Sequence, residues 1–183
     1  MKIEKTSLDG VLVIEPEFRF KDHRGEIVCA LEDEFGRWKK HNFSVSYKNV
    51  LRGIHVSNCY KLAYCPFGSI YLVAVDCREG SKYFGKWGAF EVNDDNRKMI
   101  LIPPMFGLAH LVRSQVAVFY YHWSAEFDSD KQVSYHYKSF GVSWPTENPI
   151  LSQRDRDAPL ICYDETAIMP AEQLRRMDEE DRR

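Results

Sequence analysis

The chain has 183 residues, of which 44% are hydrophobic and 28% are charged, a composition typical of a globular protein with a substantial core. Its 25 Lys and Arg residues nearly balance its 27 Asp and Glu residues, which gives a formal net charge of −2 with histidine neutral. A nucleic-acid-binding surface normally brings a clear basic excess, so this balance argues against a nucleic-acid partner. We expect one domain over residues 1–183.

No stretch of the sequence reaches the roughly 20 apolar residues of a membrane-spanning helix. Residues 1–6 lack the apolar run of a secretory signal, and we expect no association with a membrane. Five cysteines form an odd set without a CxxC spacing: Cys29, Cys59, Cys65, Cys77 and Cys162. This pattern favours reduced thiols in a cytoplasmic protein over a disulfide framework or a structural zinc site.

Short apolar or alternating runs, separated by turn residues, recur along the chain. In chain order, we expect strands at residues 11–14, 27–31, 42–46, 62–65, 69–76, 88–92, 99–102 and 116–123. Many short strands with Gly, Pro, Asn and Asp between them predict an all-β sandwich or barrel. Helical periodicity is convincing only at residues 171–177, after Pro170, and a charged tail follows at residues 178–183.

Ionisable side chains interrupt several of the apolar runs. Arg52, His55, Lys61 and His110 each lie inside a run that otherwise builds a core. Each alone has an ordinary structural explanation, because a strand histidine is commonly hydrogen-bonded in the core and a lysine commonly extends its ammonium into water. Burying all four without partners would cost several kcal/mol each. Their combination favours a polar cleft that binds an anionic ligand.

Residues 116–123 show how alternation bears on such a cleft. Side chains alternate across a strand, so Phe119, Tyr121 and Trp123 share one face, and Tyr120 and His122 share the other. Alternation alone does not decide which face is interior.

Several ordered motifs share their residues and spacing with one known family. They are DHRGE at 22–26, NVLRGIH at 49–55, YKL at 60–62, GSIYLVAVDCREGS at 68–81, FGKW at 84–87, IPPMFGLAH at 102–110, FYY at 119–121 and PILSQRDR at 149–156. Through them the chain resembles the dTDP-4-dehydrorhamnose 3,5-epimerases over residues 11–160. The resemblance implies a cupin-like jelly-roll β-barrel that needs no cofactor and no metal ion.

The resemblance also implies roles for individual residues. His55 matches the general base, Asp155 the carboxylate that orients it, and Tyr121 the general acid. Lys61 matches a catalytic cation of the site. The predicted substrate-binding residues are Arg24, Arg52, His110, Glu26, Ser46 and Asn42. Members of the family are dimers whose arms complete the neighbouring site, so the resemblance implies a homodimer and places Arg24 at the partner's site.

The residue types suit inversion beside a ketone. A C4 ketone acidifies the hydrogens on C3 and C5, because the carbanion delocalises onto oxygen as an enolate. Inversion needs a base on one face of the sugar and a proton donor on the other, and imidazole suits the base because it titrates near working pH. A cation such as Lys61 stabilises the enolate oxygen, and arginine forks such as Arg24 and Arg52 bind a diphosphate.

Two departures from the family pattern bear on the substrate. Residues 56–60 alone separate His55 from Lys61, a shorter loop than in typical rhamnose-pathway members, and Lys40 stands where thymidine-type enzymes present a glutamine. The short loop is similar to the branch that acts on GDP-4-keto-6-deoxy-heptoses. The expected partner is therefore a GDP- or dTDP-linked 4-keto sugar, a hexose or heptose, inverted at C3, C5 or both.

Other functions stay open at this point. The same barrel can host a sugar 3,4-ketoisomerase, an epimerase restricted to one carbon, or a non-catalytic nucleotide-sugar-binding protein. A metal-dependent cupin is disfavoured, because such proteins usually carry two histidines spaced by one residue, and His55 is followed by Val56 and Ser57.

Overall fold

The computed structural model describes residues 2–16, 19–28, 38–126 and 132–162. Its strands are β1 (Lys2–Lys5), β2 (Leu12–Glu15), β3 (Arg19–Asp22), β4 (Gly25–Val28), β5 (Lys40–Tyr47), β6 (Leu51–Val56), β7 (Lys61–Phe67), β8 (Ser69–Asp76), β9 (Trp87–Asn93), β10 (Met99–Ile102), β11 (Phe106–Val112), β12 (Val116–Trp123) and β13 (Val133–Ser134). A 3₁₀ turn at Ser139–Gly141 and the short helix α1 (Gln153–Arg156) follow.

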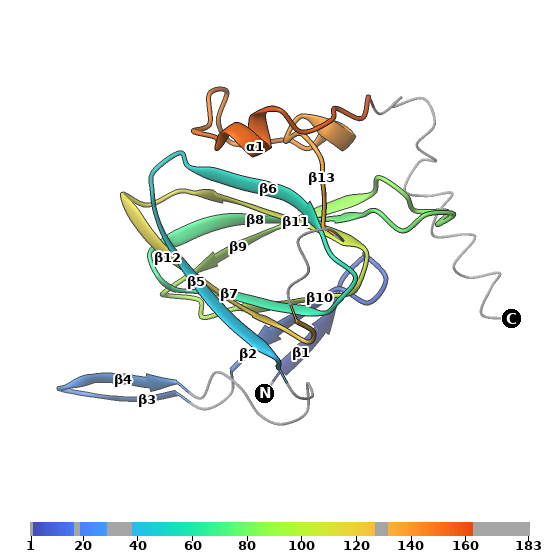
Figure 1. The fold of residues 1–183 in the computed structure, drawn as a ribbon. Coiled ribbons are helices and arrows are strands. Elements are labelled where there is room, and N and C mark those ends of the chain that lie inside the picture. The colour runs from blue at the N-terminus through green and yellow to red at the C-terminus, as the bar shows by residue number, and fades with distance from the viewer. Residues whose placement is uncertain (1, 17–18, 29–37, 127–131, 163–183) are drawn as a thin grey trace, which may run out of the picture.

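Two antiparallel sheets face each other and enclose the core (Figure 1). The six-stranded sheet has the order β1-β2-β10-β7-β12-β5, and the five-stranded sheet has the order β13-β6-β11-β8-β9. Strands β3 and β4 pair only with each other and form a hairpin that projects from the barrel (Figure 1). The predicted all-β architecture is confirmed.

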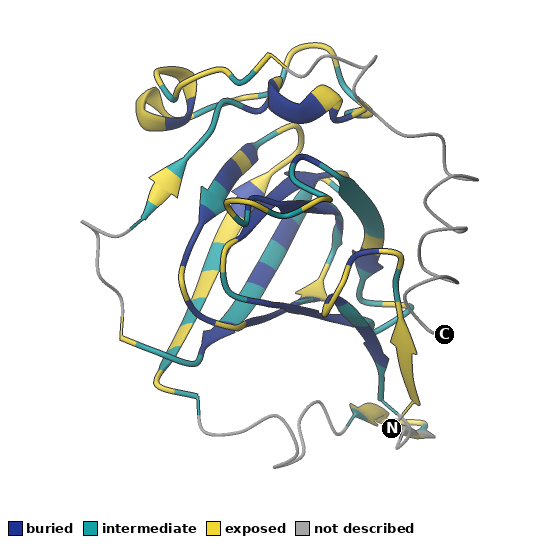
Figure 2. Ribbon diagram, turned by 90° about the vertical axis from the view of Figure 1, so that its right-hand side faces the viewer, coloured by how far each residue is buried: buried dark blue, intermediate teal, exposed yellow. Residues whose placement is uncertain are grey.

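Apolar strands in the middle of each sheet build the core. β11 is buried along its whole length between β6 and β8, whereas the edge strand β5 alternates between inward and exposed side chains. Figure 2 shows that the buried residues concentrate in the strands of the barrel. The main cluster includes Ile70, Leu72, Ala74, Ile100, Phe106 and Phe119. Burial on this scale is the principal favourable term for such a fold.

The expected strands agree well with the observed ones in the barrel and less well outside it. Strands at 69–76, 99–102 and 116–123 were predicted with their observed limits, and β5, β7 and β9 extend one or two residues beyond the expectation. β1, β3, β13 and α1 were not expected, because each is too short to show periodicity. β6 and β11 are also absent from the expected strands, although their segments were noted as apolar runs that carry Arg52, His55 and His110. The helix predicted at residues 171–177 lies outside the described residues.

Within the described ranges, no helix is both long and apolar enough to cross a membrane. Cys59, Cys65, Cys77 and Cys162 are free thiols, as the odd cysteine set predicts.

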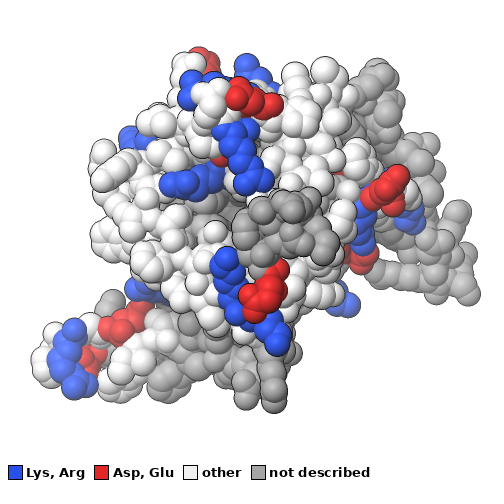
Figure 3. All heavy atoms as spheres, in the orientation of Figure 1, with Lys and Arg blue, Asp and Glu red and all other residues white. Residues whose placement is uncertain are grey.

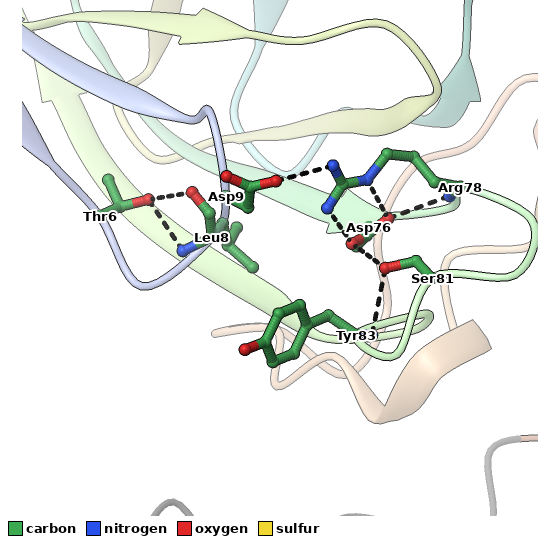
Figure 4. Close-up of polar contacts among 7 residues, drawn as sticks. All are labelled: Thr6, Leu8, Asp9, Asp76, Arg78, Ser81 and Tyr83. Atoms are coloured by element: carbon green, nitrogen blue, oxygen red, sulfur yellow. Dashed lines mark hydrogen bonds and ion pairs between the residues drawn. The ribbon is translucent and has the colours of Figure 1, made fainter. Parts of the chain in front are cut away.

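An ion-pair network ties the N-terminal loop to the loop after β8 (Figure 4). Asp76 is 1% exposed, and it accepts hydrogen bonds from Arg78 Nη2 at 2.7 Å and from Ser81 Oγ at 2.9 Å. On its other side, Arg78 Nη1 donates to Asp9 Oδ2 at 2.9 Å. Burial alone would raise the pKa of Asp76, but the hydrogen bonds from Arg78 and Ser81 outweigh it and lower that pKa. The buried carboxylate thus depends on one guanidinium.

We predict that Arg78→Ala lowers the free energy of unfolding by about 3–5 kcal/mol, because it leaves the buried Asp76 carboxylate without its counter-charge. Asp9→Ala is the matched control: the Asp9 side chain is 71% exposed, so its loss should cost no more than about 1 kcal/mol. Urea denaturation of both variants measures the two costs. Equal losses would show that Asp76 does not depend on Arg78.

Candidate active site

A cavity of about 290 Å³ lies between the two sheets and collects most of the predicted site residues. β6 contributes Arg52 and His55, β7 contributes Lys61, β11 contributes His110, β12 contributes Tyr121 and α1 contributes Asp155. The base and the acid predicted from sequence therefore face one shared space, each from a different sheet.

Arg52 and His55 face the same cavity because β6 is irregular between them. In a regular strand, residues three apart point to opposite faces. Here three steps along β6 oppose two steps along β11, so β6 carries one extra residue, as in a β-bulge. At this irregular point β6 comes close to Ala109 on β11, and only glycine fits there. The φ of Gly53 is +128°, and a Cβ at this position would lie 2.4 Å from the Cβ of Ala109.

The imidazole of His55 is held by the carboxylate of Asp155. His55 Nε2 lies 2.7 Å from Asp155 Oδ1, and Asp155 is 3% exposed. Burial alone would raise the pKa of Asp155, but hydrogen bonds from His55, Ser152 and the Gly53 backbone N–H lower it. An ionised carboxylate therefore fixes the ring and leaves Nδ1 as the nitrogen that Asp155 does not engage.

The phenol of Tyr121 stands on the facing sheet. Tyr121 is half-buried on β12, and its ring stacks with Phe119 at 5.1 Å between centroids. Burial raises the pKa of the Tyr121 phenol, against the smaller effects of a hydrogen bond with Asn42 and of the Arg52 charge. The group is thus protonated at neutral pH, as a proton donor must be.

Two further buried nitrogens face the same cavity. Lys61 is 3% exposed, its Nζ lies 4.7 Å above the Trp123 ring, and burial lowers its pKa to about 8. His110 is 4% exposed, and burial, with the charges of Arg52 and His55, lowers its pKa to about 3. His110 is therefore neutral, and its Nε2 has no hydrogen-bond partner among the described residues. Lys61 and His110 thus offer a cation and a neutral imidazole to a ligand in this cavity, beside the guanidinium of Arg52.

The sequence model of one protein family, described as dTDP-4-dehydrorhamnose 3,5-epimerase, matches residues 5–162. The chain belongs to this family. It is a nucleotide-sugar epimerase, an isomerase of 4-keto-6-deoxy sugars at C3 and C5 or at C3. Its fold is the cupin-like barrel that the sequence resemblance implied.

Named relatives agree. The epimerase is 33% identical over 169 residues to dTDP-4-dehydrorhamnose 3,5-epimerase of Shigella flexneri, covering 85% of this chain and 93% of that protein. It is 30% identical to dTDP-4-dehydrorhamnose 3-epimerase of Streptomyces niveus, covering 88% and 84%. The crystal structure of the Legionella pneumophila dTDP-6-deoxy-D-glucose-3,5-epimerase in complex with dTDP-4-keto-L-rhamnose has a TM-score of 0.83 at 30% identity, covering 91% and 96%.

Two predicted binding residues of the epimerase support others rather than line the cavity. Ser46 is buried on β5, and its Oγ accepts a hydrogen bond from Arg52 Nε at 3.1 Å. Asn42, also on β5, lies opposite Tyr121 in the register and hydrogen-bonds its phenol. Ser46 therefore orients a cavity residue of the facing sheet, and Asn42 orients one of the neighbouring strand β12.

Arg24 and Glu26 are two predicted site residues that neither line this cavity nor contact a residue that lines it. Both lie on the projecting β3–β4 hairpin (Figure 1). The Arg24 side chain is 72% exposed and pairs with Asp22 at 2.6 Å, while Glu26 pairs with Arg97 at 3.0 Å. Within one chain of the epimerase, neither contacts the base or the acid.

Seven further cavity residues were not predicted as site residues: Ser44, Phe119, Trp123, Gln132, Arg154, Leu108 and Ser152. Alternation along β5 and β12 gives the signal for the first three, since they share a face with Ser46 or Tyr121. Gln132 and Arg154 come from loop and helix, and Arg154 Nη2 donates to Gln132 Oε1 at 2.9 Å. Figure 3 shows basic side chains gathered on this face of the epimerase near β6 and α1.

In the part of the chain that the structure describes, no three His, Cys, Asp or Glu side chains are grouped so as to hold a metal ion.

The pKa of Lys61 predicts the alkaline side of the pH profile. Burial lowers it to about 8, so the ammonium is present below that pH and lost above it. Because kcat/KM reports groups of the free enzyme, we expect it to fall about tenfold per pH unit above this pKa. Lys61→Arg should remove the fall, since guanidinium stays charged. A wild-type profile that stays flat to about pH 10 would exclude the cationic form of Lys61 from the reaction.

Proposed function

We propose that the epimerase inverts C3, C5 or both carbons of a nucleotide-diphospho-4-keto-6-deoxy sugar, with His55 as the base and Tyr121 as the acid. The observation that carries the proposal is that the two groups line one cavity from opposite sheets, with Asp155 fixing the imidazole. A sugar ring between the sheets would have the base on one face and the acid on the other.

The proposed inversion consists of two proton transfers, one to His55 and one from Tyr121. Nδ1 of His55 takes the hydrogen from the carbon beside the ketone, and the electron pair delocalises onto the C4 oxygen as an enolate. Asp155 stabilises the imidazolium that forms, and the Lys61 ammonium stabilises the enolate oxygen; removing one such donor typically costs about 10²–10³ in rate. Tyr121 returns a proton to the opposite face of the carbon, which inverts the centre.

The diphosphate is assigned to Arg52. Its Nε is held by Ser46 at 3.1 Å, which leaves the terminal nitrogens of the planar fork to bind phosphate oxygens. His110 stands beside it as a neutral hydrogen-bonding group. The two together would anchor the end of the substrate that carries no reacting carbon.

We propose a small number of candidates for the nucleotide and the sugar of the substrate. Relatives named for dTDP sugars favour dTDP, whereas Lys40 weakens the claim for dTDP and the short loop at 56–60 favours a GDP-4-keto-6-deoxy-heptose. A relative named as a 3-epimerase keeps inversion at C3 alone as the second candidate. We also propose the cytoplasm as the compartment, where the free thiols of the described cysteines would stay reduced.

Deuterium exchange tests the reaction. With dTDP- and GDP-linked 4-keto-6-deoxy sugars in D₂O, wild type should place deuterium at C3 or C5, detected by proton NMR. His55→Gln should slow exchange by about 10²–10⁴-fold, because it removes the base. His136→Gln, outside the cavity, is the matched control and should exchange at the wild-type rate. No exchange with any of these sugars would refute the proposal.

A homodimer is the proposed assembly. β5 is one of the two edge strands of the six-stranded sheet, and its outward Phe43, Val45 and Tyr47 are 67%, 53% and 69% exposed. Such an edge is normally covered, and we propose that a second copy of the chain covers it. The hairpin that carries Arg24 extends beyond its own barrel (Figure 1), so in a pair of copies Arg24 would be free to complete the partner's site.

Analytical ultracentrifugation tests the dimer. At micromolar concentration, wild type should sediment at twice the chain mass of 21.4 kDa. Val45→Asp should sediment as a monomer, because it places a charge in the apolar contact. Leu160→Asp, at a 52% exposed site outside β5, should remain dimeric. A wild-type species of single-chain mass would refute this assembly.

A further inference from the structure

Lys61 is a buried cation that no carboxylate balances. It is 3% exposed, and no Asp or Glu side chain of the described residues forms an ion pair with its Nζ. In the described part of the chain, Asp155 is the one carboxylate that lines the catalytic cavity, and it is bound to His55. Taking an ammonium out of water is costly unless a partner replaces the lost hydration. Another group must therefore stabilise Lys61.

The ring of Trp123 lies beside the ammonium. β12 pairs with β7, and this register sets Trp123 directly opposite Lys61, so the two side chains are cross-strand neighbours on one face. Both side chains line the catalytic cavity. The distance of 4.7 Å from Nζ to the ring centroid is inside the range of about 6 Å over which an aromatic face attracts a cation.

The other titratable groups near Lys61 supply no negative charge. Cys59, two residues earlier in the chain, is 6% exposed, and burial raises the pKa of its thiol, which is therefore neutral. Lys40, on β5, is the partner of Trp123 on its other side in the register and is itself a cation. Apart from Asp155, the remaining titratable side chains of the cavity are neutral or cationic: Arg52, His55, His110, Tyr121 and Arg154.

An aromatic face stabilises an ammonium without neutralising it. A carboxylate at the same place would carry a full negative charge and would compete with a negatively charged ligand, whereas the ring has no net charge. The hydrogen-bond acceptor that the protein offers Nζ is the backbone carbonyl of His55, at 3.5 Å, and an ammonium has further N–H groups to donate. Lys61 thus keeps both its charge and its donors for a ligand in the cavity.

We propose that Trp123 is a positioning residue of the epimerase, whose ring face holds the Lys61 ammonium where the enolate oxygen forms. Trp123 acts through Lys61 and transfers no proton itself. The inference rests on the proposed function, because it takes Lys61 as the group that stabilises the enolate.

The sign of the expected effect follows from two opposing influences on Lys61. Burial disfavours the ammonium and lowers its pKa to about 8. The negative face of the ring favours the ammonium, so weakening that face at constant burial should lower the pKa further. Truncating Trp123 would also admit water and mix the two influences. Fluorine atoms on the ring weaken its negative face and change its size little.

The test places a tryptophan fluorinated around its benzo ring at position 123 alone. NMR titration of labelled lysine side chains in the free protein gives the pKa of Lys61, whose signal is identified by its absence from Lys61→Arg. We expect this pKa to fall from about 8 to about 7, and the alkaline decline of kcat/KM for deuterium exchange to move with it. The same replacement at Trp144, half-buried outside the cavity, is the matched control and should move neither.

Two ordinary substitutions test the ring face through the rate. Trp123→Leu and Trp123→Phe both shorten the side chain, but only phenylalanine keeps an aromatic face. We expect Trp123→Leu to lower kcat by about tenfold and Trp123→Phe to recover most of that loss. Equal losses in the two variants would show that the size of Trp123 matters and its ring face does not, which would overturn the inference.

The outcomes separate this inference from the reaction. If fluorination at position 123 leaves the pKa of Lys61 unchanged, or lowers it without moving the alkaline decline of kcat/KM, the inference is overturned and inversion by His55 and Tyr121 still stands. If the wild type exchanges deuterium into none of the 4-keto sugars, the proposed function is overturned, and the role of Trp123 in it falls as well.

Discussion

The contact between His55 and Asp155 is the interaction on which the site depends. It joins a strand of the five-stranded sheet to the only α-helix in the described ranges. The carboxylate is buried yet kept ionised by donors that include the Gly53 backbone. The bulge at Gly53 thus has two effects: it turns His55 into the cavity with Arg52, and it supplies an N–H to the group that orients the imidazole. One irregular position in β6 therefore affects both the direction of His55 and the ionisation of Asp155.

The sandwich itself supplies the second requirement. An epimerase needs a base and an acid on opposite sides of one carbon, and two facing sheets present side chains toward each other across a common space. β6 and β12 place one group on each wall. Burial also affects the protonation states of two groups in this space. It keeps the phenol of Tyr121 protonated, and it leaves Lys61 a cation only below about pH 8. No movement of either strand is needed to bring the two groups together.

The sequence predicts the features that leave a periodic pattern or a motif, and it does not predict those that depend on strand pairing or loop packing. Periodicity located most of the long barrel strands, though not β6 or β11, and motif spacing located His55, Tyr121 and Asp155. Periodicity could not show that Arg52 and His55 share a face, because regular alternation separates them and only the pairing of β6 with β11 shows the extra residue. Nor could it place Glu26 and Arg24 on a projecting hairpin, since that depends on which strands pair. The place of Gln132 in the cavity depends on how a loop packs in space, which leaves no periodic signal.

The central claim is that imidazole and phenol act from opposite faces of the sugar, and Tyr121→Phe tests it most directly. In this variant His55 can still remove a proton and return deuterium from the same side. We therefore predict that, in D₂O, the variant labels the carbon beside the ketone while its configuration is retained. Inverted product formed by Tyr121→Phe at the wild-type rate would contradict the account.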